Sequence, residues 1–95
     1  MTAQYRLRLF ISGSTPRSTR AIENLRRICE EHLEGCYDLE IIDVYENPEA
    51  TRDLQVIATP TLIKLLPEPS RRTIGDMSDR DRVLAGLSLL ANAPR

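Results

Sequence analysis

Apolar residues recur along this chain with two different spacings, and glycine, proline or a helix-capping residue separates one segment from the next. Alternation with polar residues, or a short continuous apolar run, predicts a strand, whereas recurrence every three or four positions predicts a helix. Strands are predicted over Tyr5–Ile11, residues 37–44, Thr61–Leu66 and Arg71–Ile74, and helices from Pro16, over residues 49–54 and after residues 78–81. The predicted order of elements is βαβαββα.

The helix that begins at Pro16 has the clearest amphipathic pattern. Thr15 is its predicted N-cap, and proline suits the first helical position because that position needs no N–H donor. Gly35 is expected to end the helix in a left-handed conformation. The apolar face of this helix comprises Ala21, Ile22, Leu25, Ile28, Cys29 and Leu33. The last helix is predicted to begin at a capping box in residues 78–81, and its apolar face comprises Val83, Leu84, Leu87, Leu90 and Ala91.

Length and charge narrow the classes of function. A chain of 95 residues can bury one core, so residues 1–95 are predicted to form a single α/β domain. The net charge is -1 and no basic tract is present, which argues against nucleic-acid binding and favours protein partners. No apolar run reaches the roughly 18 residues of a membrane span, and no apolar signal-peptide core follows Met1. A soluble cytoplasmic protein is therefore expected.

The Thr59-Pro60 step indicates the fold more specifically. It lies before a predicted strand and after a strand, a helix and a second strand, an order that resembles the thioredoxin-like fold with Pro60 as a candidate cis proline. In redox members of that fold this proline faces a Cys-x-x-Cys pair after the first strand, but residues 12–18 of this chain contain no cysteine. Cys29 and Cys36 match neither a redox pair nor a zinc site, and they are expected to be free thiols.

No catalytic, cofactor-binding or metal site is predicted. His32 has no second ligand at a suitable spacing, and its expected role is an interaction with the dipole of its helix. Asp43 lacks the paired carboxylate, histidine or nucleophile that acid–base chemistry requires. Ser12 and Ser14 lie near a glycine but lack the lysine and the spacing of a phosphate-binding loop.

Nearly the whole chain resembles the KaiB family of bacterial circadian-clock proteins. The matching residues include Tyr5, Gly13-Ser14-Thr15-Pro16, Arg20-Ala21, Tyr37, Ile42-Asp43-Val44, Asn47-Pro48, Ile57-Ala58-Thr59-Pro60-Thr61-Leu62, Leu66-Pro67, Arg71-Arg72, Ile74-Gly75-Asp76, Val83-Leu84 and Gly86-Leu87. The resemblance implies a non-enzymatic regulator that binds the N-terminal ATPase ring of KaiC, with KaiA or a clock histidine kinase as further clock components that it recruits or displaces. It also implies two folds, a resting tetramer or dimer with a rearranged C-terminal half and a thioredoxin-like form that binds the ring.

Three basic residues are candidates for partner binding. The resemblance implies this role for Arg20 on the first predicted helix and for Arg72 on the last predicted strand, and Lys64, the only lysine, joins them as a charge that projects from a strand. Without the resemblance, Arg20 is a solubilising charge, and Arg71 and Arg72 guard an edge strand against pairing with another chain.

Three further residues are candidates for the fold switch. Thr59 and Pro60 can precede a strand, but they can equally be the N-cap and first residue of a helix. Gly86 and Ser88 weaken the last predicted helix, so its apolar run can also form a buried strand. Alanine at Gly86 is therefore expected to favour the helical, ring-binding form.

A second class of function stays open at this point. A redox-inactive thioredoxin-like stress-response protein, a chaperone or a glutathione-handling protein would use Ser14 or Thr15 in the place of the missing thiols. Retention on a glutathione column or reduction of insulin would favour this alternative, whereas ATP-dependent co-elution with a hexameric ATPase would favour the clock regulator.

Overall fold

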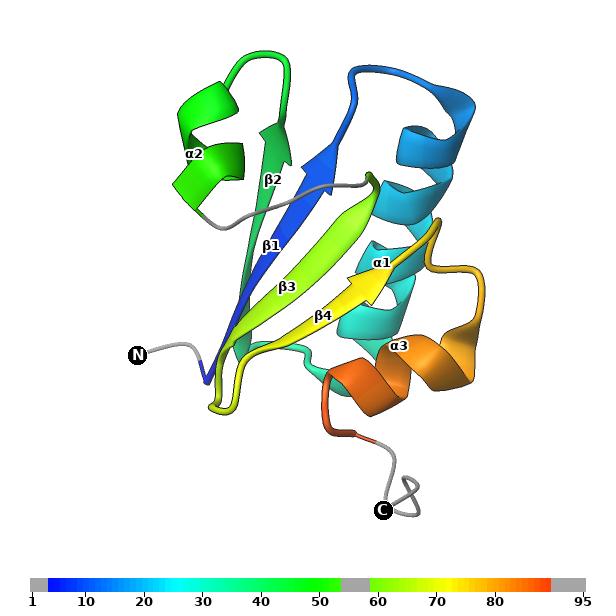
Figure 1. The fold of residues 1–95 in the computed structure, drawn as a ribbon. Helices are drawn as coiled ribbons and strands as arrows, with labels where there is room; N and C mark the ends of the chain where they lie inside the picture. Colours follow the sequence, from blue (N-terminus) through cyan, green and yellow to red (C-terminus); the bar gives the residue numbers. More distant parts are fainter. Residues whose placement is uncertain (1–3, 54–58, 90–95) are drawn as a thin grey trace.

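A computed structural model describes residues 4–53 and 59–89, and within them it contains the predicted order of elements. The elements are β1 (Tyr5–Ile11), α1 (Pro16–His32), β2 (Tyr37–Asp43), α2 (Pro48–Asp53), β3 (Thr61–Leu66), β4 (Arg71–Ile74) and α3 (Arg80–Gly86). The strands form one sheet in the order β2-β1-β3-β4 (Figure 1). β1 is parallel to β2 and antiparallel to β3, and β4 is antiparallel to β3.

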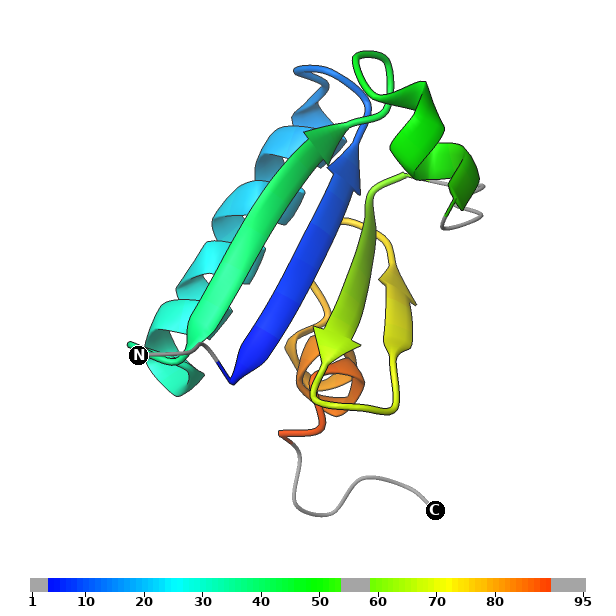
Figure 2. The same cartoon turned by 90° about the vertical axis from the view of Figure 1, so that its left-hand side faces the viewer.

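The larger part of the core lies between the sheet and the two helices α1 and α3, which share one face of the sheet (Figures 1 and 2). Alternation in β1 sends Leu7 and Leu9 to this face and Phe10 to the other. The buried residues of this core include Leu7, Leu9, Ala21, Leu25, Ile28, Cys29, Leu33, Leu62, Met77, Val83, Leu84 and Leu87. The predicted apolar faces are confirmed for the described residues: Ile22 is partly buried, and the others are buried, namely Ala21, Leu25, Ile28, Cys29, Leu33, Val83, Leu84 and Leu87.

A smaller core lies on the opposite face of the sheet, beneath α2. Phe10, Ile42 and Ile63 are buried there, and Ala50 of α2 packs against them. At the start of β1 and β2 this face carries charged side chains, and Arg8 forms a largely exposed ion pair with Glu40 on the neighbouring strand at 3.2 Å. The sheet therefore has one fully covered face and one face that α2 covers in part.

Several boundaries differ from the predicted ones. α1 ends at His32 with Leu33 as its C-cap, and Gly35 adopts the expected left-handed conformation three residues after His32. The N-cap of α3 is Asp79, which accepts a hydrogen bond from the Arg82 N–H at 3.2 Å, so the capping box predicted to start at Ser78 is displaced by one residue. α3 ends at Gly86. Residues 54, 90 and 91, which the predictions assigned to helices, lie outside the described residues.

One side-chain cluster joins the end of α1 to the start of α3. Arg80 donates to Glu31 Oε1 at 2.7 Å, and its second nitrogen lies 2.9 Å from His32 Nε2. A guanidinium can only donate, so the histidine nitrogen is the acceptor in this contact. The hydrogen bond from Arg80 lowers the pKa of the Glu31 carboxyl. His32 thus contacts α3 directly, which the dipole interpretation did not foresee.

The described residues contain neither a metal-binding cluster nor a membrane-spanning helix. No group of three His, Cys, Asp or Glu side chains in residues 4–53 and 59–89 is placed to hold a metal ion. Within the same ranges no helix is long and apolar enough to cross a membrane.

Candidate functional site

The Thr59–Pro60 peptide bond is cis, as predicted, and hydrogen bonds link Thr59 to a cluster of hydroxyl groups after β1, where a redox protein would have thiols. Ser12, directly after β1, forms a short hydrogen bond through its hydroxyl to the hydroxyl of Thr59. The Thr15 side chain caps α1 by accepting from the Ser18 N–H at 3.2 Å, and the two hydroxyls lie 2.8 Å apart. These hydroxyls therefore serve the local structure.

Asp43 organises the adjacent loops through hydrogen bonds to their backbone N–H groups. Its Oδ1 accepts from the backbone N–H of Tyr45 at 2.9 Å and from that of Gly13 at 3.3 Å. Gly13 is left-handed, with φ of 62°, and the ring of Tyr45 lies beside it. The Tyr45 side chain is 76% exposed, so it is the most exposed large apolar side chain in the described chain.

The two thiols lie away from this hydroxyl cluster. Cys29 is in the last turn of α1, whereas the cluster is at the first turn. Burial, and then the charge of Glu30, raise the pKa of the Cys29 thiol to about 12, so it stays protonated. The Cys36 thiol donates to the Leu33 carbonyl at 3.2 Å. Both cysteines are free, as expected.

Arg20 lies on the exposed side of α1, as the sequence predicted, but it is not a lone charge. Its Nε is 3.4 Å from Oδ2 of Asp76, a residue in the loop between β4 and α3. Asn24, one turn later on α1, donates to the Asp76 carbonyl at 3.0 Å. Arg20 therefore lies beside the end of β4, which is an edge strand of the sheet.

Arg72 is exposed on β4, but it points away from Arg20. It pairs with Ile63, whose side chain enters the smaller core under α2, so Arg72 projects on that face. Arg71 alternates to the face of α1 and α3. The two candidate arginines therefore stand on opposite sides of the sheet, and a partner that contacts both must reach around the β4 edge.

Lys64 differs most from its expected role. The residue is 1% exposed on the face that α3 covers, and its Nζ lies 3.1 Å from the Ser88 hydroxyl just after that helix. Burial, and then the positive charge of Arg71, lower the pKa of the Lys64 amine. In this conformation the ammonium is buried beneath the C-terminal end of α3, so the expected direct contact with a partner would require the side chain to leave its site.

The fold-switch candidates occupy the junctions of the C-terminal half. Pro60 is fully buried between the hydroxyl cluster and β3. Gly86 is the last residue of α3, and a Cβ built there would approach the Thr73 hydroxyl far inside van der Waals distance. That contact opposes the expectation that alanine at Gly86 favours this form. Ser88 is left-handed, with φ of 62°, a conformation that costs a residue with a Cβ.

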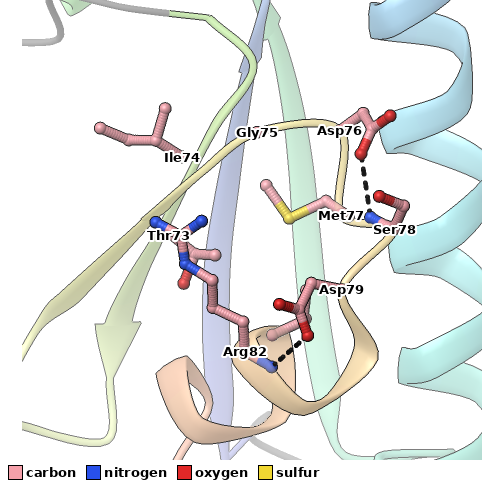
Figure 3. A pocket seen from close by; sticks show the side chains of 9 residues that line it. Thr73, Ile74, Gly75, Asp76, Met77, Ser78, Asp79 and Arg82 are labelled. Atoms are coloured by element: carbon pink, nitrogen blue, oxygen red, sulfur yellow. Dashed lines mark hydrogen bonds between the residues drawn. The ribbon is translucent and has the colours of Figure 1, made fainter.

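A small cavity of about 80 Å³ lies between β4 and α3 (Figure 3). Its walls come from the strand end at Thr73, from the loop around Met77 and from Arg82 on α3. Met77 has a left-handed conformation, with φ of 63°, and is only 4% exposed, so the loop places an apolar side chain in the core. The volume suits a few water molecules and no larger ligand.

The contacts of Asp76 with Arg20 and Asn24 were not predicted from the sequence. A Gly-Asp pair after a strand is a turn signal, because an aspartate side chain often bonds the backbone two residues on. Asp76 does this by accepting from the Ser78 N–H at 3.1 Å. The sequence contains no signal for the contact with α1, because that contact joins residues more than 50 positions apart.

Comparison with known proteins places this geometry in a family. The family model of the KaiB domain matches residues 8–89. A circadian clock oscillator protein KaiB from Synechococcus sp. (strain CC9311) is 52% identical over 86 residues, which cover 90% of this chain and 72% of that protein. Another from Microcystis aeruginosa is 50% identical over 86 residues, which cover 90% of this chain and 83% of that protein.

Solved structures show the same architecture at low sequence identity. The N-terminal domain of Synechococcus elongatus SasA has a TM-score of 0.75 at 20% identity, with 97% of this chain and 90% of that one covered. The Drosophila melanogaster thioredoxin Deadhead has a TM-score of 0.73 at 15% identity, with 93% and 82% covered. These likenesses confirm the predicted thioredoxin-like fold. The family model and the relatives at 50% and 52% sequence identity show that this chain belongs to the KaiB family.

Proposed function

We propose that this chain is a non-enzymatic regulator of a circadian clock or related timing system, and that it acts by binding the N-terminal ATPase ring of a KaiC-like protein. The observation that carries the proposal is the match to the KaiB family over residues 8–89, with relatives that are circadian clock oscillator proteins. The hydroxyl cluster at Pro60 supports a binding role, because it places no thiol where this fold carries out redox chemistry.

The ring-binding surface includes Arg20 and Arg72 and lies around the β4 edge. Both arginines are exposed, and a guanidinium can form two parallel hydrogen bonds to one carboxylate, which an ammonium cannot reproduce. Asp76, which contacts Arg20, follows the end of β4 by two residues. The two side chains therefore flank one edge of the molecule although they leave opposite faces of the sheet.

Lys64 contributes to binding indirectly in this proposal. Because its ammonium is buried against the end of α3, it holds the helical form of the C-terminal segment in place. Alanine at Lys64 is expected to weaken ring binding by reducing the population of the thioredoxin-like form. Its effect should therefore appear in the spectrum of the free protein, which distinguishes it from an interface residue.

The chain also switches fold, with Pro60, Gly86 and Ser88 at the junctions that change. The support is local conflict: a left-handed serine follows α3, and a glycine, a poor helix former, ends that helix. Such conflicts narrow the free-energy gap between two packings of one sequence. The alternative packing is a resting tetramer or dimer with a rearranged C-terminal half. On the ring, the chain recruits or displaces KaiA or a clock histidine kinase; its fold likeness to the SasA domain makes a shared docking surface geometrically feasible.

The test is co-elution of the chain with a hexameric KaiC-like ATPase, with and without ATP, monitored by size-exclusion chromatography and light scattering. Alanine at Arg20 or Arg72 should weaken binding and leave the circular dichroism of the free protein unchanged. Arg27→Ala on the same helix is the matched control for Arg20, since it also removes an exposed arginine from α1. Retention on a glutathione column without ATPase binding would favour the redox-inactive thioredoxin-like alternative.

A further inference from the structure

Asp76 contacts both Arg20 and the turn that leads into α3. We propose that Asp76 is a positioning residue, which holds the Arg20 guanidinium by its Nε edge so that the two outer nitrogens face a carboxylate of the partner protein. This inference rests on the proposed function, because it explains how Arg20 is prepared to bind the ring.

The two oxygens of the Asp76 carboxylate have separate tasks. Oδ1 accepts from the Ser78 N–H at 3.1 Å, which fixes the carboxylate on its own turn, and Oδ2 faces Arg20 Nε at 3.4 Å. Hydrogen bonds from Ser78, and then from Arg20, lower the pKa of the Asp76 carboxyl, so it is ionised at neutral pH. The Asp76 side chain is 25% exposed and the Arg20 side chain 55%, so the arginine is the group that a partner reaches.

The backbone of Asp76 is held as well as its side chain. Asn24 donates to the Asp76 carbonyl from the same side of α1 as Arg20, because the two residues are four positions apart. On either side of Asp76, Gly75 has φ of 128° and Met77 has φ of 63°, and the buried Met77 side chain anchors the turn in the core. The carboxylate therefore faces Arg20 from a fixed position.

A guanidinium held at Nε has a defined plane. Its Nη1 and Nη2 atoms form the edge that matches a carboxylate with two parallel hydrogen bonds. A long side chain that is already placed loses less conformational entropy when it binds than one that moves freely. Asp76 thus supplies orientation to Arg20 without touching the partner.

Orientation and charge predict opposite effects when Asp76 loses its charge. If only charge mattered, removing a carboxylate beside Arg20 would make the surface more positive and would tighten binding to an acidic partner. If Asp76 positions Arg20, the same change weakens binding. Asp76→Asn is a suitable substitution because its side-chain oxygen can still accept from the Ser78 N–H.

The experiment is a double-mutant cycle on affinity for the N-terminal ring of a KaiC-like ATPase with ATP. Asp76→Asn should weaken binding about two- to fivefold in the wild-type background and should have no effect in the Arg20→Ala background. Asn24→Ala removes the second support of the same turn, so it should weaken binding less than Asp76→Asn does and, like Asp76→Asn, only where Arg20 is present. Tighter or unchanged binding of Asp76→Asn, or equal weakening in both backgrounds, overturns the proposal.

A second measurement needs no partner. Proton exchange at the Arg20 Nε–H, followed by nitrogen-15 NMR of the free protein, should be slow in the wild type and faster in Asp76→Asn. Equal exchange in wild type and Asp76→Asn overturns the positioning role alone. Absence of ring binding by the wild-type protein overturns the proposed function instead, so the two failures are distinguishable.

Discussion

Alanine at Gly86 should destabilise the thioredoxin-like form, although the substitution favours a helix by itself. A glycine-to-alanine change in a helix interior contributes roughly 0.5 to 1 kcal/mol. Gly86 is the last residue of α3, so about half of that gain, roughly 0.25 to 0.5 kcal/mol, is expected there. The opposing contact is with the Thr73 hydroxyl on β4.

The energetic cost of that contact decides whether Gly86→Ala stabilises or destabilises the thioredoxin-like form. Thr73 is buried on a strand, and its Cβ would lie 3.7 Å from the new methyl, which is ordinary contact, so the clash is confined to the hydroxyl. Rotation about χ1 would move the hydroxyl away but would bring other groups of a β-branched side chain towards the helix. Overpacking of this kind costs about 1 to 3 kcal/mol. The net expectation is a loss of about 1 kcal/mol for Gly86→Ala alone.

The assay is a double-mutant cycle with Thr73→Ala, which removes the hydroxyl. Urea unfolding should give a coupling free energy of about 1 to 2 kcal/mol between the two sites, with Gly86→Ala stabilising the thioredoxin-like form only in the Thr73→Ala background. NMR signals of α3 report the population of the helical form in each variant. If Gly86→Ala stabilised that form equally with threonine and with alanine at position 73, the steric reasoning would be refuted.

Three other predictions concern the ends of the helices and the thiols. Asp79→Ala should lower the free energy of unfolding of the thioredoxin-like form by about 1 kcal/mol, because it removes the N-cap of α3, and Ser78→Ala should lower it less. Equal losses of stability for the two variants in urea unfolding would contradict the assignment of Asp79 as the cap. Iodoacetamide at pH 8 should label Cys36 in the native protein and leave Cys29 unlabelled until urea unfolds it, since the pKa of the buried Cys29 thiol is about 12. Mass spectrometry of the native and the unfolded protein measures the labelling, and labelling of Cys29 in the native protein would contradict this prediction. Ser88→Asn should stabilise the thioredoxin-like form by about 0.5 kcal/mol in urea unfolding, because asparagine tolerates a left-handed conformation better and its side-chain oxygen can still accept from the Lys64 ammonium. Unchanged stability would count against strain at this position.

The sequence predicted the elements well where the signals were local. The cap at Thr15, the proline at the first helical position and the left-handed Gly35 each depend on a few neighbouring residues, and all three are present in the structure. The α3 cap was placed one residue early because Ser78 and Asp79 are both good capping residues, and only the tertiary position of the turn selects between them.

The candidate site was predicted less completely, because its geometry depends on contacts between distant segments. Alternation along β4 shows that neighbouring arginines face opposite sides, but the sequence does not show which side faces α1. A lone lysine in an apolar strand is usually exposed, since burial of an ammonium is costly without partners. The burial of Lys64 depends on the end of α3, and no local pattern encodes that packing.

The two halves of the chain differ in how firmly local sequence determines their structure. In residues 5–43 the amphipathic pattern, the caps and the strand alternation all favour the elements observed, and that agreement between levels is what gives a sequence one stable structure. In the segment after Pro60, the local preferences of a left-handed serine and of a glycine at the end of α3 oppose the observed arrangement, and tertiary contacts, including that of buried Lys64 with Ser88, hold it. Refolding of the C-terminal half would therefore disrupt few structures that its local sequence favours, whereas refolding of the first half would disrupt many. The Arg20–Asp76 pair joins the two halves, so a partner bound at Arg20 would stabilise the C-terminal half in its thioredoxin-like form.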